Sequence, residues 1–232
     1  MESALPVRVD PHHGPCLGSD SGCGCGSCLR LPHSLPRTLL GPQVWRATEQ
    51  APIRTEPTGF DVLDRALPGG GWPLAAVSEV LHAQFGVGEL SLALPLLARL
   101  TQAGRPVAFV APPMLPYAPR LAAAGVQLSK LLVVEPGSEQ NALWSAEQLL
   151  RAAAGAVLLW IEKADTQALR RLQLAAEEND SCVLLYRSER YAAESTPSAL
   201  RLRIWRQNTM PQVEVLKCRG ARPLPLPLRT AA

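Results

Sequence analysis

The amino-acid sequence predicts an α/β fold, in which helices flank a mostly parallel sheet with an antiparallel hairpin at its C-terminal edge. Short apolar runs alternate with segments of helical periodicity between residues 58 and 219. This alternation is typical of parallel strands joined by crossover helices. The last two strand-like segments are separated only by a short turn, which predicts the hairpin. Hydrophobic residues make up 47% of the 232 residues, enough for a core of about 150 residues.

The elements of the core follow from local patterns. Phe60, Leu63 and Leu67 have the i, i+3, i+7 spacing of a short helix, which the Gly/Pro-rich turn at 68–73 ends. The predicted strands are 75–81, 107–111, 131–134, 156–161 and 182–186, and the predicted helices are 89–103, 120–124, 139–154 and 166–178. Because Pro95 lies inside the 89–103 pattern, that helix either kinks or begins later. Segments 200–207 and 212–219 complete the core as an antiparallel pair around a turn at 208–211.

The segments outside the 58–219 core differ from it in composition. Residues 1–35 are a Cys/Gly/Ser-rich leader that we expect to be disordered, unless a wrongly chosen start codon has added it. Residues 36–57 are an N-terminal linker, and residues 220–232 are a flexible Pro/Leu-rich tail. The leader contains one CxxC pair without a second pair at ligand spacing, so we expect no metal site there. Its four cysteines are Cys16, Cys23, Cys25 and Cys28.

Charge and hydropathy limit where the protein can be located in the cell and which partners it can bind. The chain has neither an 18-residue apolar stretch without charge nor a signal-peptide pattern, so we expect a cytoplasmic protein with reduced thiols and no membrane contact. Residues 181–232 contain nine Lys/Arg and three Asp/Glu. This basic surplus indicates either an anionic partner, such as nucleic acid, or a solvated basic edge.

A loop between the strand 75–81 and the next helix has part of the pattern of a phosphate-binding loop. A working loop reads G-x-x-x-x-G-K-[ST], where the lysine neutralises phosphate and the hydroxyl binds Mg²⁺. Gly86 and Gly88 supply glycines, but Glu89 stands at the lysine position and Leu90 at the hydroxyl position, with Ser91 one residue late. Because a carboxylate repels a triphosphate, we expect no ATP hydrolysis and no cofactor at this degenerate loop. A tight strand-to-helix turn is the simpler interpretation.

Several motifs in the core resemble the opening of the RecA recombinase core. They are TGFDVLD at 58–64, ALPGGGWP at 66–73 and SEVL at 78–81, and the likeness extends over roughly residues 36–220. Within that superfamily, LPGGGWP at 67–73, GELSL at 88–92 and LKCRG at 216–220 resemble the ImuA family, whose members are often described as SulA-like. The resemblance implies a RecA-like core and an accessory role in translesion DNA synthesis.

The resemblance also identifies positions that catalysis would use. Glu162 lies at the end of a Walker B-like strand. Without the lysine and the hydroxyl of a working phosphate-binding loop, a carboxylate at this position has little Mg²⁺ or nucleotide chemistry to support. Lys217 and Arg219 resemble the residues with which RecA-type proteins reach a neighbour's nucleotide, so here they are interface candidates. The segments that correspond to DNA-binding loops are short. The second offers basic residues for weak, salt-sensitive DNA contact, namely Arg187, Arg190, Arg201 and Arg203.

Two further segments are candidates for protein contacts. Val44, Trp45 and Arg46 resemble the apolar hook with which RecA-type subunits join, although Trp45 could equally fold back on its own core. The tail alternates proline and leucine, which favours extended structure and suits a partner's groove. Its apolar candidates are Leu224, Leu226 and Leu228.

Together these observations favour a non-catalytic, RecA-like adaptor of SOS-induced mutagenic translesion synthesis. The resemblance implies an ImuB-like Y-family polymerase homologue and an error-prone C-family DNA polymerase as partners, with RecA as a further one. A SulA-like inhibitor of cell division remains an alternative, because it shares the SOS context and a RecA-related core. An unconventional ATPase is the other alternative.

Overall fold

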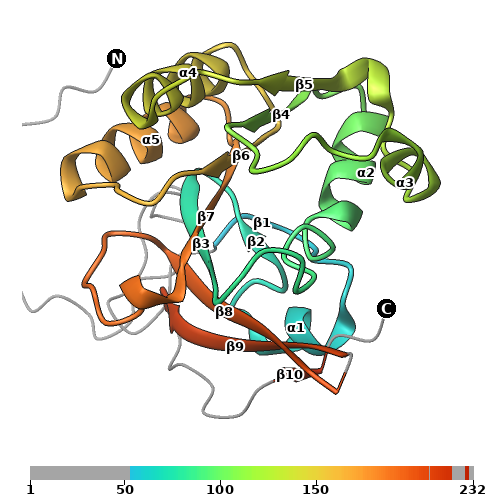
Figure 1. The fold of residues 1–232 in the computed structure, drawn as a ribbon, viewed down its shortest axis with the longest axis vertical. Helices are drawn as coiled ribbons and strands as arrows, with labels where there is room; N and C mark the ends of the chain where they lie inside the picture. Colours follow the sequence, from blue (N-terminus) through green and yellow to red (C-terminus); the bar gives the residue numbers. More distant parts are fainter. Residues whose placement is uncertain (1–52, 209, 221–227, 230–232) are drawn as a thin grey trace, which may run out of the picture. The chain divides into compact units, whose positions relative to one another are not determined.

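A single eight-stranded sheet organises the chain in the computed structural model, which describes residues 53–208, 210–220 and 228–229 (Figure 1). These residues belong to one compact unit, Ala47–Ala232. The strand order is β10-β9-β8-β3-β7-β6-β4-β5. The strands are β3 (Ala76–His82), β4 (Val107–Val110), β5 (Leu131–Val134), β6 (Ala156–Trp160), β7 (Cys182–Ser188), β8 (Leu200–Gln207), β9 (Met210–Cys218) and β10 (Leu228–Arg229).

Six neighbouring strands, from β8 to β5, run parallel to one another. Strand β9 pairs antiparallel with β8, and β10 pairs antiparallel with β9. The predicted fold class is therefore confirmed, with one refinement. The first strand of the C-terminal hairpin continues the parallel sheet beside β3, so that only β9 and β10 form the antiparallel edge.

Helices cover both faces of the sheet. They are α1 (Asp61–Ala66), α2 (Leu94–Gln102), α3 (Ala118–Ala123), α4 (Glu139–Arg151) and α5 (Thr166–Glu178). One apolar cluster joins α2 and α3 to one face, and a second joins α4 and α5 to the other (Figure 1). The central strands are buried on both faces, which explains why β4 and β6 read as continuous apolar runs.

Capping residues determine where the helices of the second layer begin. The Ser138 hydroxyl accepts a hydrogen bond from the Asn141 amide at the start of α4, and the Asp165 carboxylate accepts one from Ala168 at the start of α5. Helix α2 begins at Leu94 with Pro95 in its first turn, so of the two predicted possibilities, a kink or a later start, the later start is observed. The residues before Leu94 form a series of turns instead.

The structure also contains elements that the sequence patterns did not indicate. Strands β1 (Thr55–Glu56) and β2 (Trp72–Pro73) form a two-stranded sheet. Glycine is required at position 71 between them, because a β-carbon there would collide with the Glu56 carbonyl. Short 3₁₀ helices, η2 (Leu128–Lys130) and η3 (Glu189–Tyr191), precede β5 and follow β7. Within the expected tail, the main chain of Leu228 pairs with Val213, which attaches this extended segment to the sheet.

No helix in the described part of the chain combines the length and the hydrophobicity needed to cross a membrane.

Candidate functional site

The loop after β3 lies where an open α/β sheet usually binds ligands. The chain leaves β3, forms α2 and enters β4, although β7 and β6 lie between these two strands in the sheet. Such a change in the direction of winding leaves a crevice at the carboxyl ends of parallel strands. Residues 83–93 follow the carboxyl end of β3 and are therefore the first candidates for a binding site.

The carboxylate of Glu89 occupies this loop. The backbone amides of Gly86 and Gly88 each donate a hydrogen bond of 3.1 Å to Glu89, one to Oε1 and the other to Oε2. Both glycines have a positive φ, 82° for Gly86 and 104° for Gly88. This conformation can direct nearby backbone amides toward one point. The Glu89 residue is only 9% exposed. Amides that could bind the oxygens of a phosphate thus bind the chain's own carboxylate.

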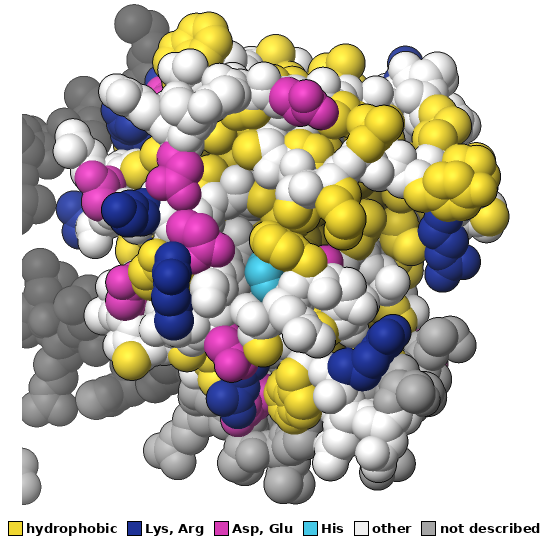
Figure 2. Space-filling model, viewed as in Figure 1, with side chains coloured by type: hydrophobic (Ala, Val, Ile, Leu, Met, Phe, Trp, Pro, Cys, Tyr) yellow, Lys and Arg dark blue, Asp and Glu magenta, His cyan; other side chains and the backbone are white. Residues whose placement is uncertain are grey.

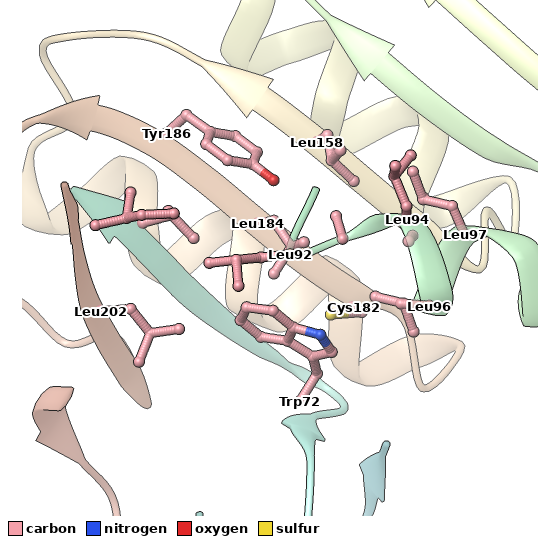
Figure 3. Close-up of a cluster of buried hydrophobic side chains, with 14 of the residues drawn as sticks. Trp72, Leu92, Leu94, Leu96, Leu97, Leu158, Cys182, Leu184, Tyr186 and Leu202 are labelled. Carbon is pink, nitrogen blue, oxygen red and sulfur yellow. The ribbon is translucent and has the colours of Figure 1, made fainter. Parts of the chain in front are cut away.

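An aromatic stack supports the loop from the sheet. The Tyr186 hydroxyl donates a 3.4 Å hydrogen bond to the main-chain oxygen of Glu89. The Tyr186 ring stacks on Trp160, with ring centroids 4.7 Å apart, and Phe109 meets Trp160 edge-on. Figure 3 shows Tyr186 in the same apolar cluster as Leu158 and Leu184. Burial raises the pKa of Tyr186 well above its ordinary value, so the hydroxyl remains a neutral donor.

His82 lies at the end of β3, where the loop begins. It is 3% exposed, and neither ring nitrogen has a hydrogen-bond partner in the described part of the chain. Its ring centroid lies 4.6 Å from that of Phe85. Burial lowers the pKa of His82, against the opposing effect of the carboxylates of Glu89, Glu162 and Glu189. A neutral imidazole here supplies no positive charge for a phosphate.

Glu162 is engaged in protein contacts at the end of β6. Its carboxylate pairs with Arg190 at 3.0 Å, and its backbone amide donates to Glu139 Oε1. The Glu162 carbonyl accepts a hydrogen bond from Arg187 Nε. Glu89 and Glu162 both lie at the carboxyl edge of the sheet, after β3 and β6 respectively. Ser91 is exposed and lies in the turn before α2.

A buried ion cluster links the neighbouring strands β7, β3 and β8 at the centre of the sheet. It consists of Glu79, Arg187 and Arg201. Glu79 of β3 is fully buried, and its Oε2 lies 3.4 Å from both Arg187 of β7 and Arg201 of β8. The hydroxyls of Thr196 and Ser198 donate to its other oxygen. Arg201 forms its hydrogen bonds elsewhere, to the main-chain oxygens of residues 191, 192 and 194. The cluster therefore fixes the connection between β7 and β8.

The ion cluster corrects the expectation that four arginines offer a surface for DNA. Arg187 and Arg201 are buried in it because Glu79 needs cationic partners inside the sheet. Arg190 remains exposed and Arg203 is half-buried, but each pairs with a carboxylate, Glu162 and Glu214 respectively. Each of the four arginines thus has a carboxylate of the same chain as a partner.

The other predicted interface residues lie away from the loop. Lys217 donates to the Thr196 carbonyl, and its pKa is lowered by burial and then by Arg201. Arg219 is exposed and lines a cavity of ≈ 430 Å³ at the amino ends of β3 and β8, opposite the Glu89 loop. The sequence patterns did not indicate this cavity, whose walls contain several small residues.

Several predicted residues cannot be compared with the structure. Val44, Trp45, Arg46, Leu224 and Leu226 lie outside the described residues, as do the four leader cysteines. In the part of the chain that is described, no group of His, Cys, Asp and Glu side chains is arranged to hold a metal ion.

Comparison with known proteins relates the chain to RecA. It is 34% identical over 105 residues to the RecA protein of Picosynechococcus sp., a match that covers 45% of this chain and 30% of that protein. It is 33% identical over 138 residues to RecA of Clavibacter michiganensis, covering 58% and 36% of the two chains. With RecA of Mycoplasma pneumoniae the identity is 27% over 161 residues, covering 60% and 48%. No family model matches the chain.

These matches and the fold define an α/β protein with a RecA-like core. The chain spans well under two thirds of the length of these RecA proteins, between 30% and 48% in the three comparisons.

The buried ion cluster predicts a large effect of a small substitution. Glu79→Gln keeps the side-chain shape but removes the carboxylate that Arg187 and Arg201 share. Arg187 then retains only the carboxylate of Glu194, and Arg201 retains only main-chain oxygens. We expect the free energy of unfolding to fall by about 3 kcal/mol, because the buried charge of Arg201 loses its counter-charge. The matched control, Glu162→Gln, removes a partly exposed pair with Arg190 and should cost less than about 1 kcal/mol. Denaturant unfolding measures both, and equal effects would contradict the role of Glu79.

His82 predicts a pH dependence of stability. Its pKa is lower in the folded chain than the ordinary 6.5, so the unfolded chain binds the proton first as the pH falls. Stability should therefore be complete above pH 6.5 and decrease as the pH falls below it. Comparing unfolding at about pH 7.5 and about pH 5.5, His82→Asn should lose less stability than the unaltered chain. His12→Asn serves as the control, and an unchanged slope in His82→Asn would refute the prediction.

Proposed function

We propose that this chain is a non-catalytic, RecA-like accessory protein of the ImuA type, which acts in SOS-induced mutagenic translesion synthesis. The observation that carries the proposal is the Glu89 carboxylate inside the loop where a RecA-like ATPase would bind phosphate. A negative charge replaces the lysine, and the amides that would receive phosphate already have an acceptor. Its role would then be to assemble other proteins rather than to perform chemistry.

Three features support an assembly role. The motifs LPGGGWP, GELSL and LKCRG resemble the ImuA family, and they lie within the RecA-like core. In the loop that carries Glu89, the amides of Gly86 and Gly88 bind the chain's own carboxylate. The surface in Figure 2 shows hydrophobic side chains gathered over the side of α2 and α3, and exposed apolar patches of this kind commonly mark protein contacts. The proposed partners are an ImuB-like Y-family polymerase homologue, an error-prone C-family DNA polymerase and RecA.

Nucleotide binding tests the non-catalytic part of the proposal. The unaltered chain should bind a fluorescent ATP analogue only weakly, with a dissociation constant well above the micromolar range. Glu89→Lys should bind it at least about tenfold more tightly, because the charge facing the phosphates is reversed. Glu177→Lys makes the same charge change on α5 and should gain nothing. Micromolar binding by the unaltered chain, together with turnover above background, would overturn the proposal.

Partner recovery tests the biological part. The tagged chain is purified from DNA-damaged cells, and mass spectrometry identifies the proteins bound to it. We expect a Y-family polymerase homologue and a C-family polymerase, with one of them lost in Trp45→Ala. Trp144→Ala, which removes an exposed tryptophan of α4, is the matched control. Recovery of the tubulin-like division protein alone would favour a SulA-like inhibitor instead.

A further inference from the structure

The cavity at the amino ends of β3 and β8 lies at the opposite end of these strands from the Glu89 loop. Its volume of ≈ 430 Å³ falls within the range of about 300–1,000 Å³ that is typical of small-molecule sites. Its walls come from segments that are distant in the sequence, namely the ribbon of β1 and β2, the turn after α1, the starts of β3 and β8, and the ends of β9 and α5. A cavity of this kind is the place in a fold where a small molecule is first expected.

The buried part of the cavity wall is apolar. Leu67 and Leu200 line it and are 5% and 0% exposed, and Leu74 adds a further apolar surface. The next residue of the wall, Ala75, has a φ of 55°. Such a conformation is strained for a residue with a β-carbon and is concentrated at functional sites. The Ala75 amide donates a 2.9 Å hydrogen bond to the Ser181 carbonyl, which holds the strained wall in place.

Positive charge gathers where the end of β9 reaches the cavity. Arg219 lines the cavity and is exposed, and the ion pairs within the described part of the chain all involve other side chains. Two residues earlier, the pKa of Lys217 is lowered by burial, by Arg201 and also by Arg219. The cations at this end of the sheet therefore repel one another, and an anion beside Arg219 would reduce that repulsion.

The other charged residues of the lining limit how much negative charge a ligand can carry. They are Arg54 and Glu177, and both are exposed, as Arg219 is. Arg54 already has a carboxylate partner, Asp180, at 2.5 Å. Glu177, in the last turn of α5, disfavours a ligand with several negative charges because like charges repel. The balance favours a single negative charge on an apolar body.

We propose that this cavity binds a small organic monoanion, a carboxylic acid with an apolar chain or ring. The carboxylate lies beside Arg219 at the exposed part of the lining, and the apolar body lies against Leu67, Leu74 and Leu200. Hydrogen bonds from a guanidinium to a carboxylate are strong and directional, so they fix the orientation of the ligand. Removal of the apolar body from water supplies the rest of the affinity. This binding site is independent of the function proposed above.

Decanoate and naphthoate are the probes, and isothermal titration calorimetry of the full chain measures their binding. We expect at least one of them to bind with a dissociation constant on the order of 10 μM, and decylammonium to bind at least about tenfold more weakly than decanoate. Cys218, a half-buried free thiol of the cavity wall, reports the location. With the bound probe at about ten times its dissociation constant, iodoacetamide should alkylate Cys218 about tenfold more slowly. Peptide mass spectrometry follows Cys218, with Cys25 of the leader as the internal control, whose rate should not change.

Two substitutions with opposite expected effects separate charge recognition from a loosened fold. Arg219→Gln should weaken binding of the carboxylate about tenfold, whereas Glu177→Gln should strengthen it about threefold. Arg206→Gln, an exposed residue near the other end of β8, is the matched control and should leave the affinity unchanged. The proposal would be overturned if the unaltered chain bound neither carboxylate, or if binding left the alkylation of Cys218 as fast as before. Equal affinities for decanoate and decylammonium, or for the unaltered chain and Arg219→Gln, would also overturn it.

Discussion

The buried carboxylate of Glu79 is the interaction on which the arrangement of the sheet depends. It lies on the central strand β3 and draws an arginine from each neighbouring strand, β7 and β8, to the interior. The same arginines hold the connection from residue 189 to residue 199 through its carbonyls and through Glu194. A segment that could have been a mobile basic loop is thereby part of the folded core. The cost of burying three charges is offset only because each has several partners.

The loop after β3 also contains a carboxylate that is held by several partners of the same chain. Two amides with glycine backbone conformations converge on one carboxylate, and the Tyr186 hydroxyl holds the carbonyl of the same residue. Hydrogen bonds from backbone amides to a carboxylate are among the stronger ones in proteins. At the carboxyl edge of the sheet, the amides of Gly86 and Gly88 are therefore already bound to an acceptor of the same chain.

Apolar runs were sufficient to predict the strands. Because β4 and β6 are buried on both faces, nearly every position in them requires an apolar residue. The hairpin of β8 and β9 also followed from the sequence, but the pairing of β8 with β3 did not, because it depends on residues far apart in the chain. The presence of Glu89 at the lysine position of the loop was visible in the sequence, whereas its contacts with Gly86 and Gly88 needed backbone geometry. The placement of Arg187 and Arg201 was wrongly anticipated. A glutamate inside the buried strand 75–81 was the signal that they would be needed in the interior.

The position of Glu89 has a consequence for how such a protein can evolve. Exchanging a carboxylate for lysine is a small genetic step, yet here it would leave two amides without an acceptor in a loop that depends on them. The folded loop therefore requires an acceptor at this position. A positive charge gained here by mutation would also remove part of the stability of the loop, so that a new ligand could be bound only at the expense of the fold.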